Sequence, residues 1–170
     1  MAEEEEASQA AGHPGASVSS SIEFRFPSIP QSVNKLYFSR GGRRVLSSQG
    51  RKFKNSFIAG RGGVTARELM CFTGISTDIY QLELWFFLLP DRLFHKTFGQ
   101  DKRVKSPFRD IDVSNMVKLA EDSIAELVGI RDRNNFTVIA HKRVAEDGDE
   151  GMVARLHTLN LEDDPHALDR

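Results

Sequence analysis

The sequence contains one cysteine, Cys71, among its 170 residues. No disulfide can therefore form within the chain, and we expect Cys71 to be a small buried apolar side chain in a protein of a reducing compartment. The sequence has no run of 18 apolar residues that could cross a bilayer. Its first residues lack the basic and apolar regions of a secretory signal. Together these absences predict a cytoplasmic protein that has no membrane partner.

Several common site motifs are also missing. The five histidines show no metal-ligand spacing, and there is no P-loop. The glycine-rich residues 60–63 lack the frame of a phosphate-binding loop, so we interpret them as a helix stop. His141 and His157 alternate with apolar residues, which favours a position on a sheet surface over catalysis. Trp85 and the two phenylalanines after it are interpreted as core residues.

The net charge of -1 conceals an uneven distribution. Residues 21–146 hold 21 Lys and Arg against 13 Asp and Glu, a balance of +8, whereas Glu3 to Glu6 and residues 147–170 are acidic. A basic body between acidic ends favours a polyanionic partner. The alternative interpretation is a solvated surface of mixed charge.

The length is sufficient for one domain with a hydrophobic core. Residues 1–20 combine four glutamates with few large apolar groups, so we expect a disordered acidic segment. Residues 21–159 would form a single small domain, and residues 160–170 a loose tail.

Apolar periodicity and turn residues predict the elements of this domain. The expected strands are 21–26, 78–89, 136–141 and 152–157, together with a hairpin near residues 36–38 and 44–46. The expected helices are 48–58 and 115–128, and residues 91–110 are expected to form a long loop. Strand 78–89 is nearly continuously apolar at its end, which suggests burial on both faces. The predicted class is α+β: a mixed β-sheet that includes the hairpin, with two main helices packed on it.

The stretch RDIDVSNMVK, residues 109–118, places two carboxylates two residues apart at the start of the second helix. Asp110 and Asp112 can close on one divalent cation if the chain bends there, and Asn115 and Lys118 can share a helix face. Carboxylates beside a helix start and a lysine suit a hard cation next to a phosphate. Asp132 is a third candidate ligand, provided that its loop folds back or that it approaches from a neighbouring strand.

Each of these residues also has an ordinary structural interpretation. Asp112 and Ser114 are typical helix caps, and Asp110 can be a solvated loop acid. Lys118 and Asp122 have the spacing of a surface ion pair. Asp132 lies in a stretch of turn composition.

The order of several motifs resembles the RusA-type Holliday junction resolvases, or crossover junction endodeoxyribonucleases, over roughly residues 21–145. The similar stretches are PQSVNKLY at residues 30–37, RRVLSSQGRKF at 43–53, the segment from Asp110 to Lys118, and Asp122 and Asp132. The resemblance implies a homodimeric enzyme of a bacterial or phage-infected cell that uses Mg²⁺, or Mn²⁺, to cut branched DNA in recombination and repair. It assigns Asp110, Asp112 and Asp132 to the metal and Lys118 to catalysis.

Two departures from the family pattern concern this acidic site. The family has Arg-Asp-x-Asp-Asn with a lysine three residues after the asparagine. If this motif is aligned without a gap on Asn115 and Lys118, the family's first aspartate falls on Asp112 and its second on Ser114, which is not an acid. An alignment on residues 109–112 keeps both acids but makes residues 113–114 an insertion. Near Asp132 the family usually has two adjacent acids, and here Arg133 follows a single one.

The leading hypothesis is a magnesium-dependent, structure-selective endonuclease. Its DNA contacts would come from a set of basic and amide side chains, largely through phosphates: Asn34, Lys35, Arg40, Arg43, Arg44, Arg51, Lys52, Lys54, Arg109 and Asn115. The first alternative is a weakened or inactive protein that binds junctions on the same scaffold. A further alternative is an interaction module whose acidic ends matter more than its body.

Overall fold

The computed structural model describes residues 20–30, 37–73, 79–103, 105–109, 111 and 113–159. Within these ranges it describes the backbone but not the side chain of Tyr37, Arg40, Arg44, Asn115, Asp132 and Phe136. The elements follow in the order β1 (Ser21–Phe26), β2 (Tyr37–Arg40), β3 (Arg43–Leu46), α1 (Ser48–Ala59), η2 (Arg61–Gly63), α2 (Ala66–Thr73), β4 (Tyr80–Leu88), α3 (Pro90–Leu93), α4 (Val113–Val128), η3 (Asp132–Asn134), β5 (Asn135–Val144) and β6 (Gly151–Thr158).

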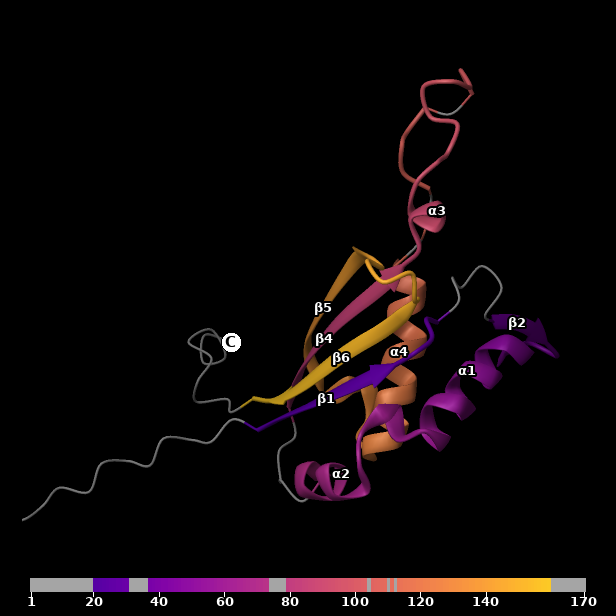
Figure 1. The fold of residues 1–170 in the computed structure, drawn as a ribbon. Helices are drawn as coiled ribbons and strands as arrows, with labels where there is room; N and C mark the ends of the chain where they lie inside the picture. The colour runs from indigo at the N-terminus through magenta and orange to yellow at the C-terminus, as the bar shows by residue number, and fades with distance from the viewer. Residues whose placement is uncertain are drawn as a thin grey trace, which may run out of the picture.

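The main sheet has four strands in the order β1-β6-β4-β5 (Figure 1). β6 is antiparallel to both β1 and β4, while β4 and β5 are parallel. This mixed sheet with helices packed on it confirms the predicted α+β class. The hairpin is confirmed as β2 and β3, but its expected place in the main sheet is wrong, because these strands form a separate two-stranded sheet.

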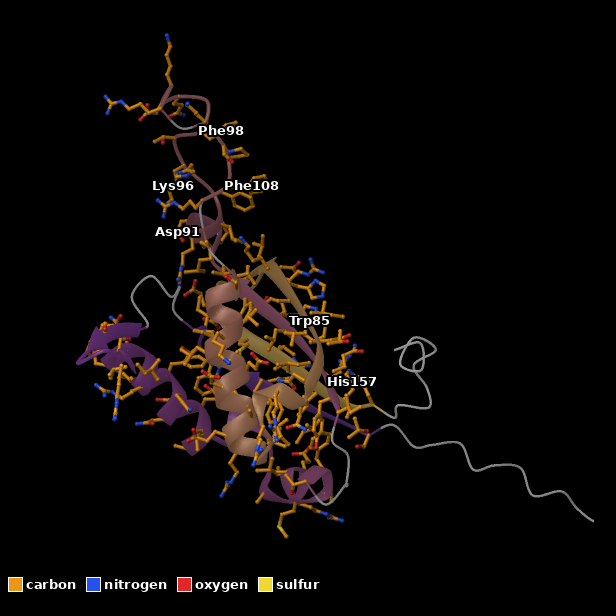
Figure 2. All side chains as sticks on the ribbon, turned by 180° about the vertical axis from the view of Figure 1, so that it is seen from behind. Trp85, Asp91, Lys96, Phe98, Phe108 and His157 are labelled. Atoms are coloured by element: carbon orange, nitrogen blue, oxygen red, sulfur yellow. The ribbon has the colours of Figure 1, made fainter. Side chains whose placement is uncertain are left out.

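The central strand β4 alternates along its whole length. Its inward residues are buried: Tyr80, Leu82, Leu84, Phe86 and Leu88. The side chains between them, including Trp85 and Phe87, are half-buried on the opposite face. The expectations that both faces are buried and that Trp85 and Phe87 are core residues are therefore wrong, because the helices cover one face of the sheet. Figure 2 shows Trp85 on the side away from α4.

Helix α4 connects the parallel strands β4 and β5 and lies along the inner face of the sheet (Figure 1). Its apolar stripe buries Met116, Leu119, Ala120, Ile124 and Val128. The stripe confirms the predicted helix, which begins two residues earlier than expected. Gly129 follows its last residue with φ of 79°, a backbone conformation that favours glycine at a helix end.

Helix α1 packs beside α4 and against the end of β1 (Figure 1). Ser47 caps it by accepting a hydrogen bond from the Gly50 backbone N–H at 3.1 Å. Its buried Phe53 and Phe57 contact Phe26 edge-on, with ring centroids 5.5 and 5.3 Å apart. The helix ends at Gly60, which confirms that residues 60–63 stop a helix.

Helix α2 is absent from the sequence-based assignment, although it has a local signal. Thr65 and Glu68 form a capping box: the Glu68 carboxylate accepts from the Thr65 N–H at 2.8 Å, and the Thr65 hydroxyl accepts from the Glu68 N–H at 3.2 Å. Hydrogen bonds from the Thr65 hydroxyl and N–H lower the pKa of Glu68. Cys71 lies on this helix and is exposed, so its predicted burial is wrong.

No helix in the described ranges is both long enough and apolar enough to span a membrane.

A close backbone approach joins η2 to β1 at Gly63. Its φ is 85°, and a Cβ there would lie 2.2 Å from the Arg25 carbonyl oxygen. Gly99 has φ of 84° with nothing within 4 Å of its Cβ position. Gly99→Ala should therefore cost only the left-handed strain of about 1–2 kcal/mol. Gly63→Ala should cost about 1–3 kcal/mol more, because the backbone must also move.

Denaturant unfolding of both glycine variants and the wild type measures this difference. Equal losses of stability in the two variants would contradict the close approach of η2 to β1.

Candidate functional site

The segment with the predicted carboxylates lies at the end of the sheet where β4 finishes. From β4 the chain passes through α3 and a projecting arm, then returns to begin α4 at Val113 (Figure 1). Asp110 and Asp112 lie outside the described residues, but Arg109, Ile111 and Val113 are described. Asn115 lies in the first turn of α4, and its side chain is not described.

Ile111, between the two aspartates, is attached to β5. The Lys142 ammonium on β5 donates to the Ile111 carbonyl oxygen at 2.8 Å, and the Ile111 N–H donates to the Arg109 carbonyl at 2.9 Å. The Ile111 side chain packs against the core. The chain between the predicted ligands is therefore held from two sides.

Lys118 is half-exposed on α4 and pairs with two acids of the same helix. Its ammonium lies 3.0 Å from the Asp122 carboxylate and 3.8 Å from that of Glu121. The Lys118–Asp122 pair confirms the ordinary interpretation of this spacing. An exposed pair of this kind contributes at most about 1 kcal/mol.

Asp132 follows the opposite end of α4. The helix has 16 residues, which at 1.5 Å per residue separate its ends by about 24 Å. The backbone of η3, which Asp132 begins, leads directly into β5. Within one chain, the described backbone after α4 continues into β5 and does not fold back toward Val113.

A hollow of about 500 Å³ lies beside η3. It is lined in part by Gly129, Arg131, Arg133 and Tyr80. Two exposed arginines therefore flank Asp132 in the sequence and line a concave surface. Sequence reasoning treated Arg133 only as a departure from the family pattern.

The predicted DNA-contacting residues outside α4 that the structure describes lie on the β2–β3 hairpin, on α1 and at the return of the arm. Arg43 is exposed on the β2–β3 hairpin, Arg51 and Lys52 are exposed on α1, and Arg109 is exposed where the arm returns. Lys54 instead forms an ion pair with Glu126 of α4, which ties the two helices together. Asn34 and Lys35 lie outside the described residues, and the side chains of Arg40 and Arg44 are not described.

The loop expected at residues 91–110 contains a structured projection, which we call the arm: residues 94–103 and 105–109. Phe94 and Phe108 form an antiparallel bridge, with ring centroids 5.7 Å apart. The His95 N–H donates to the Pro107 carbonyl and the Arg109 N–H to the Leu93 carbonyl, each at 2.8 Å. The arm extends beyond the end of the sheet (Figure 1).

The β5–β6 turn fixes the base of the arm. The Glu150 carboxylate accepts from the Arg92 guanidinium at 2.8 Å and from the Leu89 N–H at 3.3 Å. The arm therefore starts from a fixed point at the end of β4. Its sequence shows no strand alternation, but its phenylalanines and lysines were a signal of function.

The outer face of the sheet carries a separate polar cluster. The Trp85 ring stacks on His141 with centroids 5.7 Å apart, and the Arg155 guanidinium lies 5.5 Å from the Trp85 ring. Arg155 also donates to the Glu23 carboxylate at 2.7 Å. The hydrogen bond from Arg155 is the largest cause that lowers the pKa of Glu23; burial opposes it, and a hydrogen bond from Arg25 lowers this pKa further. These contacts confirm a sheet-surface position for His141.

Among the described residues, no three His, Cys, Asp or Glu side chains are grouped so that they could hold a metal ion. The side chains of Asp110, Asp112 and Asp132 are not among these described residues. No protein-family model matches the chain, and no curated protein matches it. Its function must therefore be inferred from its residues and their geometry.

The bond from Lys142 to Ile111 can be tested without an activity assay. Lys142→Met keeps most of the aliphatic stem but removes the donor, so the backbone from Arg109 into the first turn of α4 should open more often. We expect amide hydrogen exchange there to accelerate by roughly 5- to 10-fold, the equivalent of about 1 kcal/mol. Arg143→Met, at the next and exposed position of β5, is the control. Equal exchange in both variants would contradict this anchoring role.

Proposed function

We propose that this protein is a magnesium-dependent endonuclease that hydrolyses phosphodiester bonds in branched DNA. The observation that carries the proposal is the position of residues 109–113 at the start of a helix, anchored to β5 by Lys142 and followed by Lys118. The basic arm and the exposed Arg51 and Lys52 support a polyanionic substrate. The order of motifs shared with the RusA-type resolvases supports DNA as that polyanion.

The donor set at the α4 start fits Mg²⁺. One chain offers two carboxylates there, Asp110 and Asp112, and magnesium is commonly held by one or two carboxylates together with water and substrate phosphate oxygens. Mn²⁺ accepts the same oxygen donors. When bound, the metal would activate water and neutralise charge at phosphorus.

The protein's own side chains would bind the phosphate and stabilise its negative charge during hydrolysis. In hydrolysis a water oxygen bonds to phosphorus, a P–O bond breaks, and the departing oxygen takes up a proton. Lys118, released from Asp122, would stabilise the negative charge that develops on the phosphate or the departing oxygen. Asn115 would position a ligand or a phosphate, and the α4 N-terminus favours the anion electrostatically.

One observation favours a second candidate, a junction-binding protein without hydrolytic activity. Lys118 is already compensated by Asp122 and Glu121. A surface ion pair is a sufficient structural reason for a lysine at this position. An activity assay must therefore distinguish the endonuclease from a protein that binds DNA junctions but does not hydrolyse them.

Cleavage of a labelled four-way junction tests the main proposal. Wild type should introduce nicks with Mg²⁺ and none with chelator, and linear duplex should be cut much less. Asp112→Asn should reduce the nicking rate by roughly a hundredfold or more while junction affinity changes little. Asp149→Asn, which removes an exposed carboxylate from the β5–β6 turn, should leave the rate unchanged.

Two results would contradict parts of this proposal. Undiminished nicking by Asp112→Asn would exclude the metal assignment. Tight junction binding by wild type without any nicks would favour the inactive binding protein.

The distance of about 24 Å along α4 has a consequence for Asp132. If Asp132 contributes to the metal site, it must come from a second copy of the chain, which agrees with a homodimer that cuts two opposed strands. In such a dimer each site combines Asp112 of one subunit with Asp132 of the other.

Mixed dimers distinguish this arrangement. Asp112→Asn and Asp132→Asn should each be inactive as homodimers. Co-refolded in equal amounts, they should recover about a quarter of wild-type nicking, because half of the dimers are mixed and each has one intact site. Inactivity of the mixture would show that both acids serve one site within a chain, and full activity of Asp132→Asn alone would remove this residue from the site.

A further inference from the structure

Exposed phenylalanines concentrate on the arm. Seven large apolar side chains lie exposed among the described residues, and three of them are Phe94, Phe98 and Phe108 of the arm. Their exposed fractions are 37%, 48% and 63%. Apolar groups clustered in this way on a protein surface usually mark a contact with another molecule.

The same projection is basic. Residues 94–108 contain four cations and one acid, Asp101. The Asp101 carboxylate accepts a hydrogen bond from the Arg103 backbone N–H at 2.9 Å and so helps to shape the turn. The four cations are exposed: Lys96, Lys102, Arg103 and Lys105. Cations interleaved with aromatic rings are the combination that binds single-stranded or unpaired nucleic acid.

The arm presents these groups from a constrained base. The Phe94–Phe108 bridge and the two backbone hydrogen bonds beside it close the arm, and Arg92 with Glu150 attaches it to the sheet. Figure 2 shows Lys96, Phe98 and Phe108 on the projecting part, well away from the sheet that carries Trp85. An element held only at its base can enter a gap in a partner without displacing the core.

We propose that the arm enters the branch point of branched DNA. Lys96, Lys102, Arg103 and Lys105 would contact phosphates there. Phe98 and Phe108 would stack on bases that have lost their neighbours at the branch. The inference rests on the proposed function and adds the element that distinguishes a branched substrate from a duplex.

The choice of a branch point follows from the aromatic groups. In a continuous duplex each base is already stacked, so an inserted ring must first separate two stacked bases, which is unfavourable. At a branch the strands separate and unstacked base faces are available. Cations alone would bind both forms, so the rings provide the discrimination.

The choice of DNA over an anionic lipid surface follows from the chain itself. The arm returns through Arg109 directly into residues 109–113, where the candidate carboxylates lie. An extended chain from Phe94 to Lys102 spans at most about 30 Å, so the tip of the arm stays within about 30 Å of its base beside the α4 start. One DNA molecule with a phosphate at the α4 start can therefore also contact the arm.

Equilibrium binding in chelator, where no cleavage occurs, tests this inference. A fluorescent four-way junction is compared with a linear duplex of the same arm sequence. Phe98→Ala should weaken junction binding about tenfold and leave duplex binding unchanged. Phe98→Tyr, which keeps the ring, should retain the junction preference. Met70→Ala, at an exposed apolar position on α2, is the control.

The charged residues have a different signature. Lys102→Gln combined with Lys105→Gln should weaken the binding of junction and duplex in parallel. It should also reduce the slope of log K against log salt by about 1.8, since each lost phosphate contact contributes about 0.9. A loss restricted to the junction would contradict the assigned division between cations and rings.

The outcomes separate this inference from the proposed function. Wild-type nicking with an unchanged junction preference in Phe98→Ala would overturn the role of the arm and leave the nuclease intact. A junction preference that depends on Phe98, without nicking by wild type, would support the arm and overturn hydrolysis. Phe98-dependent binding to phosphatidylserine vesicles with no effect on DNA would identify a lipid surface and overturn the inference.

Discussion

Packing of α4 against the inner face of β4 is the constraint on which the rest of the structure depends. Leu82, Leu84 and Phe86 are completely buried, and the helix supplies Met116, Leu119 and Ile124 opposite this face of the sheet. Because α4 joins two parallel strands, it must run back along the sheet from the end of β4 to the start of β5. The helix start is therefore fixed at the end of β4, and its last residue at the start of β5.

This crossover also determines which functional candidates can meet. The chain leaves the end of β4 through the arm and returns there through residues 109–113. A polyanion bound by the arm is therefore close to residues 109–113. Asp132 follows the far end of the same helix and has two arginines beside it. Spacing in the sequence cannot distinguish these positions, because a separation of twenty positions from Asp112 to Asp132 fits either a return loop or a complete helix. The apolar periodicity of residues 116–128 already favoured the complete helix.

Local patterns predicted the elements well and their arrangement less well. The periodicity of residues 21–26 and the stripe of α4 depend on neighbours in sequence, and each was sufficient to identify an element. The Thr65–Glu68 capping box could have identified α2 in the same way. By contrast, the separation of the hairpin from the main sheet and the half-burial of Trp85 depend on which face the helices cover. The Phe94–Phe108 bridge joins two residues of a segment without alternation, so only the folded chain identifies it as part of an arm.

The outer face of the sheet shows why half-buried aromatics need not indicate a missing partner. Arg155 lies over the Trp85 ring and also donates to Glu23, while His141 stacks on that ring from the adjacent strand. The ring is thus shielded by polar groups that remain hydrated at their edges. The phenylalanines of the arm differ in this respect: Phe94 and Phe108 contact each other but remain more than one third exposed, on a projection that adds nothing to the core. Apolar surface that stays exposed on a projection outside the core is a stronger indication of binding than aromatic content alone, and it makes the arm, rather than the outer face of the sheet, the better candidate for a recognition surface.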